Sequence, residues 1–270
     1  MPTALCNNAN LYYETEGHSG SPVLLIMGLG AQGAAWGFQR PALRERHRLA
    51  WYDHRGIGRS DPLSGAVTVA GMAADAVGLL DALGWADAHV VGISMGGMIA
   101  QELALSARER VRSLALIATQ AGGAVGWLPP SRGLQVVARL AATRGDERLS
   151  ALRGLAFSGD YLDQIDPTVL RANLRGVDQP PDTRVILAQL LAVLRHNTAA
   201  RLHALAGLPT LIFKPEHDVL VRPEQSDRLH DLIPGSTLVS LPDTGHAAMM
   251  QGADVINPLL LDHFAAVDAG

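Results

Sequence analysis

Short apolar runs that alternate with helical patterns constrain the fold of this 270-residue chain more than any other feature. Val23–Met27 is such a run, and its length and composition are typical of a strand buried on both faces of a sheet. Helical periodicity follows in segments such as Val69–Leu83, which stops at Gly84. Because strands and helices alternate with short links, we predict an α/β fold with a mostly parallel sheet flanked by helices. Further strands are expected at Leu11–Thr15, Arg48–Tyr52, His89–Ile93, Ser113–Ala118, Thr210–Phe213 and Thr237–Leu241.

The alternation stops in the middle of the chain and then resumes. Residues 121–206 contain helical patterns without a convincing buried strand. A loop of that length without structure of its own is uncommon, so we expect an ordered helical cap. The predicted division is a core domain of residues 1–120 and 207–270 with a cap of residues 121–206 inserted. Helices in the cap are expected at Gly133–Thr143, Arg148–Phe157, Thr168–Gly176 and Asp182–His196.

Composition excludes several classes of protein. The net charge of −4 and the isoelectric point of about 6.2 argue against a nucleic-acid partner. The single cysteine, Cys6, excludes an internal disulfide and a cysteine metal cluster. Neither a signal-peptide pattern nor an apolar run of membrane-spanning length is seen, so we expect a cytoplasmic protein without a membrane span. A homodimer is compatible with the sequence, which does not decide the oligomeric state.

The segment Gly92–Gly96 has the pattern Gly-x-Ser-x-Gly with Ser94 at its centre. A buried strand is expected to end at Ile93, and a helix is expected to begin after Met95. Such a turn lifts a serine hydroxyl above the sheet edge, and glycines two residues to either side relieve backbone crowding. The helix start also directs N–H groups and a positive dipole end toward developing negative charge. We therefore predict that Ser94 is a nucleophile, the alternative being a helix-capping serine beside packing glycines.

A serine nucleophile needs a histidine base that is oriented by a carboxylate. Among ten histidines, His246 is placed best, because it follows the last expected strand in the loop that opens the final helix. Asp218 follows the strand Thr210–Phe213 and is predicted to orient His246. Glu216 is the rival acid, two residues away. We favour Asp218 because its spacing from the strand leaves room for a turn.

Two main-chain N–H groups are predicted to form an oxyanion hole. One belongs to Met95, the residue after the nucleophile, and the other to Leu29 in the loop after the strand Val23–Met27. Because these donors are main-chain groups, side-chain identity says little about them. The alternative for the segment Gly28–Gly30 is an ordinary tight turn.

Taken together, these motifs resemble those of the α/β-hydrolase fold superfamily, in the branch of serine hydrolases with a helical cap after the sixth strand. The order Ser, Asp, His along the chain is also that of this family. Met27 stands where the family commonly has a histidine that buttresses the loop, and Arg55 is expected to bind loop carbonyls beside the active site. The resemblance covers nearly the whole chain and is carried by Met27–Gly30, Asp53–Asp61, Gly92–Gly97, Glu216–Asp218 and Gly245–His246.

The resemblance implies an enzyme that cleaves a carboxylic ester or lactone of a small to medium apolar molecule through an acyl-enzyme, without a metal or organic cofactor. C–C bond hydrolysis and thioester hydrolysis use the same three side chains and stay open, as does a ligand-binding relative that does not turn over. A serine at the turn argues against the branches that use aspartate there. Candidate walls of the substrate pocket are Trp36, Trp127, Phe157 and Tyr161.

Overall fold

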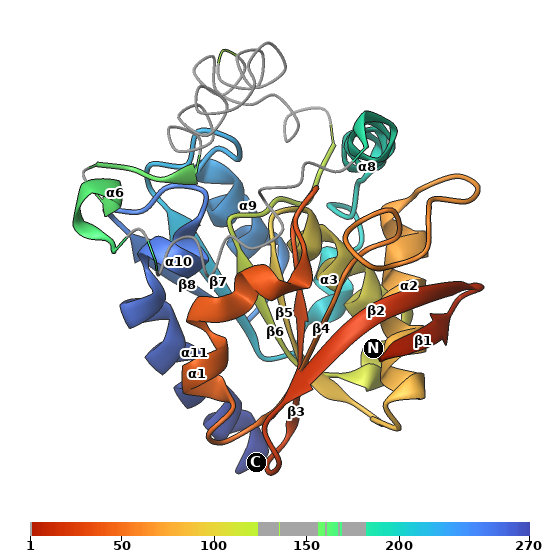
Figure 1. The fold of residues 1–270 in the computed structure, drawn as a ribbon. Coiled ribbons are helices and arrows are strands. Elements are labelled where there is room, and N and C mark those ends of the chain that lie inside the picture. Colours follow the sequence, from red (N-terminus) through yellow and green to blue (C-terminus); the bar gives the residue numbers. More distant parts are fainter. Residues whose placement is uncertain (1, 124–134, 136–155, 160, 167, 169–181) are drawn as a thin grey trace.

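A mixed sheet lies at the centre of the computed structural model, which describes residues 2–123, 135, 156–159, 161–166, 168 and 182–270. Within these residues eight strands form one sheet in the order β1-β2-β4-β3-β5-β6-β7-β8 (Figure 1). The β1–β2 and β2–β4 pairs are antiparallel, and every pair from β4 to β8 is parallel, which confirms the predicted α/β class. The strands are β1 (Thr3–Cys6), β2 (Ala9–Glu16), β3 (Pro22–Ile26), β4 (Arg48–Tyr52), β5 (Ala88–Ile93), β6 (Val111–Ile117), β7 (Thr210–Pro215) and β8 (Thr237–Leu241).

Helices cover both faces of the sheet, as the fully buried strands β3 and β5 predict. Leu24 and Ile26 of β3 belong to an apolar layer shared with α2, α3 and α9, whereas Val23 and Leu25 belong to a second layer shared with α10 and α11. Figure 1 shows α1 and α11 on one side and α2 and α3 on the other. The helices are α1 (Arg40–Leu43), α2 (Val69–Ala82), α3 (Met95–Ser106), α6 (Tyr161–Gln164), α8 (Thr183–Arg195), α9 (Glu224–Leu232), α10 (Ala248–Gln251) and α11 (Ala253–Asp268), and 3₁₀ turns lie at Gly33–Phe38, Arg108–Arg110 and Leu202–Leu205.

Two local expectations are wrong. Helical periodicity from about residue 34 to 46 predicts one helix there, but the segment is a 3₁₀ turn followed by the short helix α1, with Pro41 in the first turn of α1. Proline has no N–H group to continue a preceding helix but fits the start of a new one, so the segment divides there. The strand β1 was not expected, because its side chains alternate between exposed and buried and it is only four residues long.

The two ends of the predicted cap meet at the sheet. Ala121 follows β6, and its carbonyl accepts a hydrogen bond from Thr198 N–H at 2.8 Å. Gly122 pairs with Asn197 in an isolated antiparallel bridge, so the chain leaves and returns at neighbouring points. Helix α8 confirms the helix expected at Asp182–His196, whereas the expected cap helices at 133–143 and 168–176 and most of that at 148–157 lie outside the described residues. Of the helices described, none is long and apolar enough to cross a membrane.

Candidate active site

Ser94 occupies a tight turn between β5 and α3. Its φ of 55° and ψ of −122° place a residue with a side chain in a region that favours glycine, which marks a locally strained backbone. Close packing around the turn explains the neighbouring glycines. A Cβ atom on Gly92 would lie 2.3 Å from Gly96 O, and one on Gly96 would lie 2.1 Å from Ile26 O. The turn that carries Ser94 therefore requires small residues at both positions.

Three further bonds hold this turn. Ser94 N–H donates to Ile117 O of the neighbouring strand β6 at 3.0 Å, and Thr119 Oγ1 donates to Ser94 O at 2.7 Å. The N–H of Gly97 also donates to Ser94 O at 3.0 Å, in the first turn of α3. The serine main chain is therefore bound on both sides, while its side chain remains half-buried.

His246 and Asp218 are brought together by the structure. His246 Nδ1 lies 2.7 Å from Asp218 Oδ2, and the Asp218 side chain is completely buried. Asp218 Oδ1 accepts hydrogen bonds from Leu220 N–H at 2.7 Å and Val221 N–H at 2.9 Å. The carboxylate is thus held by two main-chain donors and directs its other oxygen at the imidazole. With Nδ1 occupied in this way, Nε2 is the ring nitrogen left for another partner.

The rival acid has other partners. Glu216 Oε1 accepts a hydrogen bond from Ser240 Oγ and lies 3.6 Å from Lys214 Nζ. Asp218 is therefore the acid that the fold places against His246, in agreement with the spacing argument.

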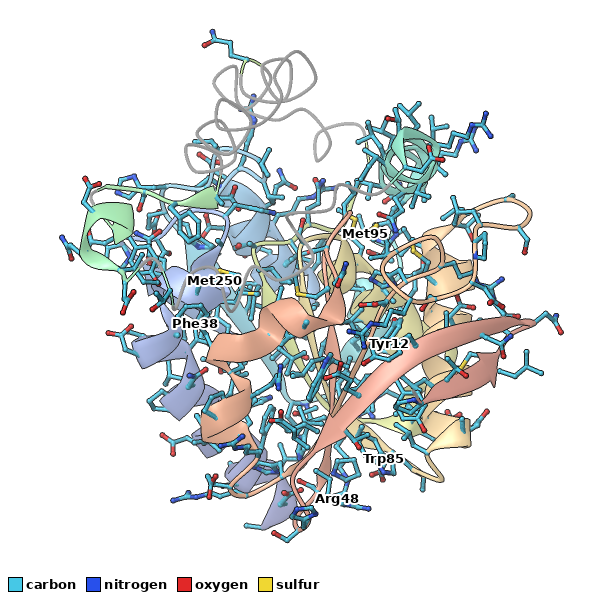
Figure 2. All side chains as sticks on the ribbon, viewed as in Figure 1. Tyr12, Phe38, Arg48, Trp85, Met95 and Met250 are labelled. Carbon is cyan, nitrogen blue, oxygen red and sulfur yellow. The ribbon has the colours of Figure 1, made fainter. Side chains whose placement is uncertain are left out.

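All three side chains belong to one edge of the sheet. Ser94 follows β5, Asp218 follows β7 and His246 follows β8, and these strands are parallel members of the run β5-β6-β7-β8. Carboxyl ends of parallel strands lie at a common edge, where ligands of α/β proteins usually bind. Figure 2 shows this edge: Met95, after β5, and Met250, after β8, lie toward one end of the molecule. Arg48, at the start of β4, and Trp85, before β5, lie toward the other end.

The loop after β3 passes directly against Ser94. A Cβ atom on Gly28 would lie 3.2 Å from Ser94 Cβ and 3.7 Å from Ser94 Oγ. This places the predicted oxyanion loop, with Leu29 half-buried, beside the predicted nucleophile. The next residue, Gly30, donates its N–H to Gln189 Oε1 of α8 at 2.9 Å. Helix α8, which belongs to the predicted cap, therefore contacts this loop.

His54 supports the same loop through a hydrogen bond to its main chain. Its side chain is buried, and this burial lowers the pKa of His54, which favours the neutral imidazole. His54 Nε2 lies 2.9 Å from Met27 O, and since a carbonyl can only accept, the nitrogen donates. His54 lies in the Asp53–Asp61 motif, but sequence reasoning gave it no role.

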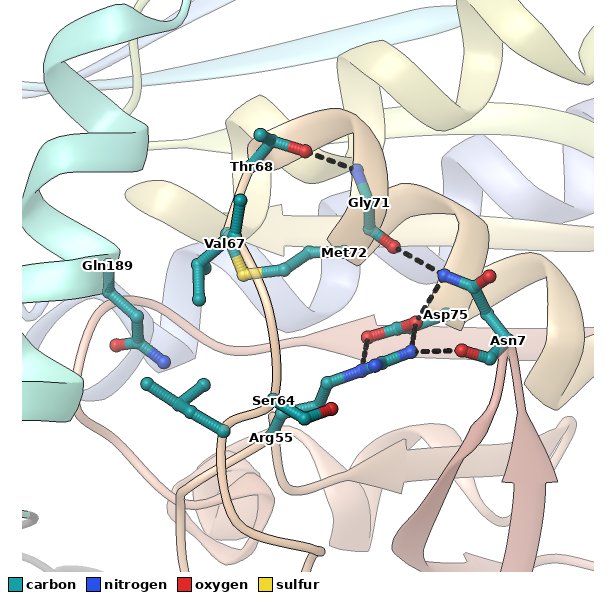
Figure 3. Close-up of a pocket in the computed structure, with 11 residues that line it drawn as sticks. Asn7, Arg55, Ser64, Val67, Thr68, Gly71, Met72, Asp75 and Gln189 are labelled. Atoms are coloured by element: carbon teal, nitrogen blue, oxygen red, sulfur yellow. Dashed lines mark hydrogen bonds and ion pairs between the residues drawn. The ribbon is translucent and has the colours of Figure 1, made fainter.

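Arg55 binds elsewhere than expected. Its Nε and Nη2 atoms lie 2.8 and 2.6 Å from the two carboxylate oxygens of Asp75 on α2, and Nη2 also donates to Asn7 O between β1 and β2. Figure 3 shows the end of the Arg55 side chain bonded to both residues, at a cavity of about 70 Å³ that Gln189 also lines. Arg55 therefore joins its loop to α2 and the β1–β2 turn. The expectation that it binds carbonyls beside the active site is wrong, because its Nε and Nη2 atoms bind the Asp75 carboxylate and carbonyls of the β1–β2 turn.

The predicted pocket walls divide into three groups. Trp36 is completely buried in the apolar layer that β3 shares with α10 and α11. It therefore offers no surface to a ligand, and its prediction as a pocket wall is wrong. Trp127 lies outside the described residues. Phe157 and Tyr161 are half-buried and stacked, with ring centroids 5.3 Å apart and an interplanar angle of 16°. A Cβ atom on Gly245 would lie 3.0 Å from Phe157 C, so the main chain of Phe157 packs against the loop that carries His246.

Comparison with known proteins agrees with this architecture. The sequence model of the α/β hydrolase fold matches residues 21–253. A relative from Azorhizobium caulinodans, named "Putative carbamate hydrolase RutD", is 34% identical over 269 residues, which cover 99% of this chain and 100% of the relative. A Klebsiella pneumoniae protein of the same name is 32% identical over 255 residues, which cover 92% and 93%.

Among solved structures, the crystal structure of the enol-lactonase from Burkholderia xenovorans matches with a TM-score of 0.84 and 27% identity, covering 98% of this chain and 100% of that one. The resemblance inferred from the motifs is therefore confirmed, and the chain belongs to the α/β hydrolase fold family.

Proposed function

We propose that this protein is a serine hydrolase that cleaves a carboxylic ester or lactone of a small to medium apolar molecule. The observation that carries the proposal is the buried Asp218 carboxylate against His246 Nδ1, at the same sheet edge as the strained Ser94 turn. A family shared with relatives named as hydrolases supports action on ester or amide-like bonds.

In the proposed reaction, Ser94 Oγ attacks the substrate carbonyl carbon while His246 Nε2 takes the hydroxyl proton. Asp218 keeps the other ring nitrogen protonated and stabilises the imidazolium that forms. His246 then donates the proton to the leaving alcohol, and the acyl group remains on Ser94. Water attacks this acyl-enzyme, with His246 again as the base, and releases the acid and the free serine.

The negative oxygen of each tetrahedral intermediate is bound by the main-chain N–H groups of Leu29 and Met95. Support for this assignment is the position of the Gly28 backbone against Ser94 and the start of α3 at Met95. Bonds from His54 to Met27 O and from Gly30 to Gln189 hold the loop before substrate binds. Donors held in place before the reaction stabilise developing charge most effectively.

Carbamate hydrolysis is a second candidate, and it is favoured by the name of the relatives that are 34% and 32% identical over most of the chain. A carbamate offers Ser94 the same kind of carbonyl carbon and differs in the nitrogen attached to it. Support for an ester or lactone comes from the buried Asp218–His246 pair at the Ser94 edge and from the structural match named an enol-lactonase, which covers 98% of this chain.

A fluorophosphonate probe and a substrate panel test the proposal. The probe should form an adduct at Ser94 in the unchanged protein and none in Ser94→Ala, whose fold should survive. The panel should contain p-nitrophenyl esters, lactones, carbamates, acyl-CoA thioesters and vinylogous diketones, the last of which report C–C cleavage. Undiminished hydrolysis by Ser94→Ala contradicts the mechanism, and an unlabelled Ser94 favours a ligand-binding relative.

A further inference from the structure

We propose that Gln251 is a positioning residue for His246. Its carboxamide holds the main chain of the loop of residues 243–246, and it binds that loop to residues 156–158 of the predicted cap, called here the cap segment. This inference rests on the proposed function, in which His246 is the base. Gln251 is the last residue of α10, and its side chain is half-buried.

The carboxamide binds two points of the loop that precedes His246. Gly245 N–H donates to Gln251 Oε1 at 3.0 Å, and Gln251 Nε2 donates to Asp243 O at 2.6 Å. One point is the residue next to His246, and the other lies three residues before it. Because the same planar group binds a donor and an acceptor of this loop, it opposes shifts of the main chain that carries the imidazole.

The same carboxamide also binds the cap segment. Ser158 N–H donates to Gln251 Oε1 at 3.1 Å, and Gln251 Nε2 donates to Ser158 O at 2.9 Å. Ser158 Oγ donates to Asp243 O at 2.6 Å, which adds a direct bond between the cap segment and the loop. The amide thus lies between the two segments and uses both its acceptor and its donors on each.

The loop and the cap segment also pack closely against each other through their main chains. Ala247 N–H donates to Ala156 O at 2.6 Å, and a Cβ atom on Gly245 would lie 2.9 Å from the same oxygen. Bonds to the cap segment therefore lie on both sides of His246 in the sequence.

Two different groups thus fix the base. Asp218 binds Nδ1 and sets the rotation and the protonated nitrogen of the ring. Gln251 fixes the main chain from which the ring projects, and this sets the distance from Nε2 to the serine. A catalytic group displaced by about 1 Å can lose about 10²-fold in rate, so a residue that touches neither substrate nor Ser94 can still control kcat.

The chemistry of the amide predicts a graded series of variants. Gln251→Leu removes every hydrogen bond that the side chain makes. Gln251→Glu keeps an acceptor for the N–H groups of Gly245 and Ser158 but places an acceptor against the carbonyls of Asp243 and Ser158. We expect kcat for p-nitrophenyl acetate to fall by ~10- to 100-fold in Gln251→Leu and by less in Gln251→Glu, with KM nearly unchanged. The rate of Ser94 phosphonylation should fall in parallel, because it needs the same base.

Gln39→Leu is a matched control. Gln39 Nε2 donates to Met249 O of the same helix α10 and, at 3.1 Å, to Asn257 Oδ1, and within the described residues these bonds do not reach the loop of residues 243–246. This variant should lower the free energy of unfolding while kcat stays near that of the unchanged protein. It therefore separates loss of stability around α10 from loss of position of His246.

The proposal is overturned if both Gln251 variants keep the kcat of the unchanged protein, or if Gln39→Leu lowers kcat as much as Gln251→Leu. Should Gln251→Leu not fold, Gln251→Glu decides by the same comparison. Failure of the proposed function has a different signature, since Ser94 would then remain unlabelled in the unchanged protein as well.

Discussion

Asp218→Asn is the substitution that most directly tests the geometry around His246. Asp218 Oδ1 accepts hydrogen bonds from the N–H groups of Leu220 and Val221 at 2.7 and 2.9 Å, and Oδ2 lies 2.7 Å from His246 Nδ1. Asparagine has nearly the same size, but it replaces one oxygen with an NH₂ group that can only donate. The substitution therefore leaves the packing intact and changes the direction of one hydrogen bond.

The two orientations of the new amide differ in cost. If the NH₂ group faces Leu220 and Val221, the buried N–H of Val221 and the part-buried N–H of Leu220 lose their acceptor, and a buried donor left unpaired costs about 1–3 kcal/mol. The amide therefore turns its oxygen toward those donors and its NH₂ group toward His246. Nδ1 must then accept, so the ring proton resides on Nε2, the nitrogen that has to accept the proton of Ser94. We expect kcat to fall about 10⁴-fold, equivalent to about 5.5 kcal/mol of transition-state stabilisation.

Steady-state hydrolysis of p-nitrophenyl acetate measures this loss, and a denaturant titration checks that the variant is folded. Glu216→Gln is the matched control, because Glu216 lies two residues away and binds Ser240 and Lys214. Its kcat should stay within about twofold of the unchanged protein. The reasoning is refuted if Asp218→Asn keeps more than about a tenth of kcat, or if Glu216→Gln loses as much as Asp218→Asn does.

Three further predictions follow from burial and close contacts. Gly96→Ala would set a Cβ atom 2.1 Å from the main-chain oxygen of Ile26, so the free energy of unfolding in urea should fall by about 1–3 kcal/mol; an unchanged urea midpoint would contradict this. Burial lowers the pKa of His89 to about 4, although the negative charge of Asp268 acts to raise it. Below about pH 6.5 the unfolded chain therefore binds a proton at His89 that the native state does not bind. Stability should therefore fall as the pH falls from about 6.5 toward 4, by up to about 1.4 kcal/mol per pH unit, and His89→Asn should show a shallower dependence in urea titrations at several pH values. Cys6 is fully buried, and burial raises its thiol pKa to about 11, so a chromogenic disulfide reagent should react with it in denaturant but not with the native protein at pH 8.

Most of the sheet could be predicted because burial on both faces leaves a direct mark on composition. Strands such as β3 and β5 are buried at every position, and their apolar runs predict them without any knowledge of neighbours. The strand β1 lies at the edge with alternating exposure and gives a much weaker signal. The segment that becomes α1 shows helical periodicity, but the position of Pro41 divides it, which a count of apolar residues does not reveal.

The site could be predicted where its chemistry depends on local sequence. The Ser94 turn needs glycine at defined offsets within one strand-to-helix connection, so the pattern appears in a few consecutive residues. Contacts made by Gln189 and Gln251 have no such signature. These glutamines reach Gly30 and Ser158, which are distant in the sequence, and either helix could carry a glutamine for many other reasons.

The sequence by itself therefore determined the class of fold, the turn that carries Ser94 and the order of the three proposed catalytic side chains. Tertiary structure decided that Asp218 and not Glu216 meets His246, that Arg55 binds Asp75, and that Trp36 belongs to the core. The physical reason is the range of the interactions. Backbone conformation and burial of a strand depend on neighbours along the chain, whereas hydrogen-bond partners depend on how separate strand ends and helices come together in space.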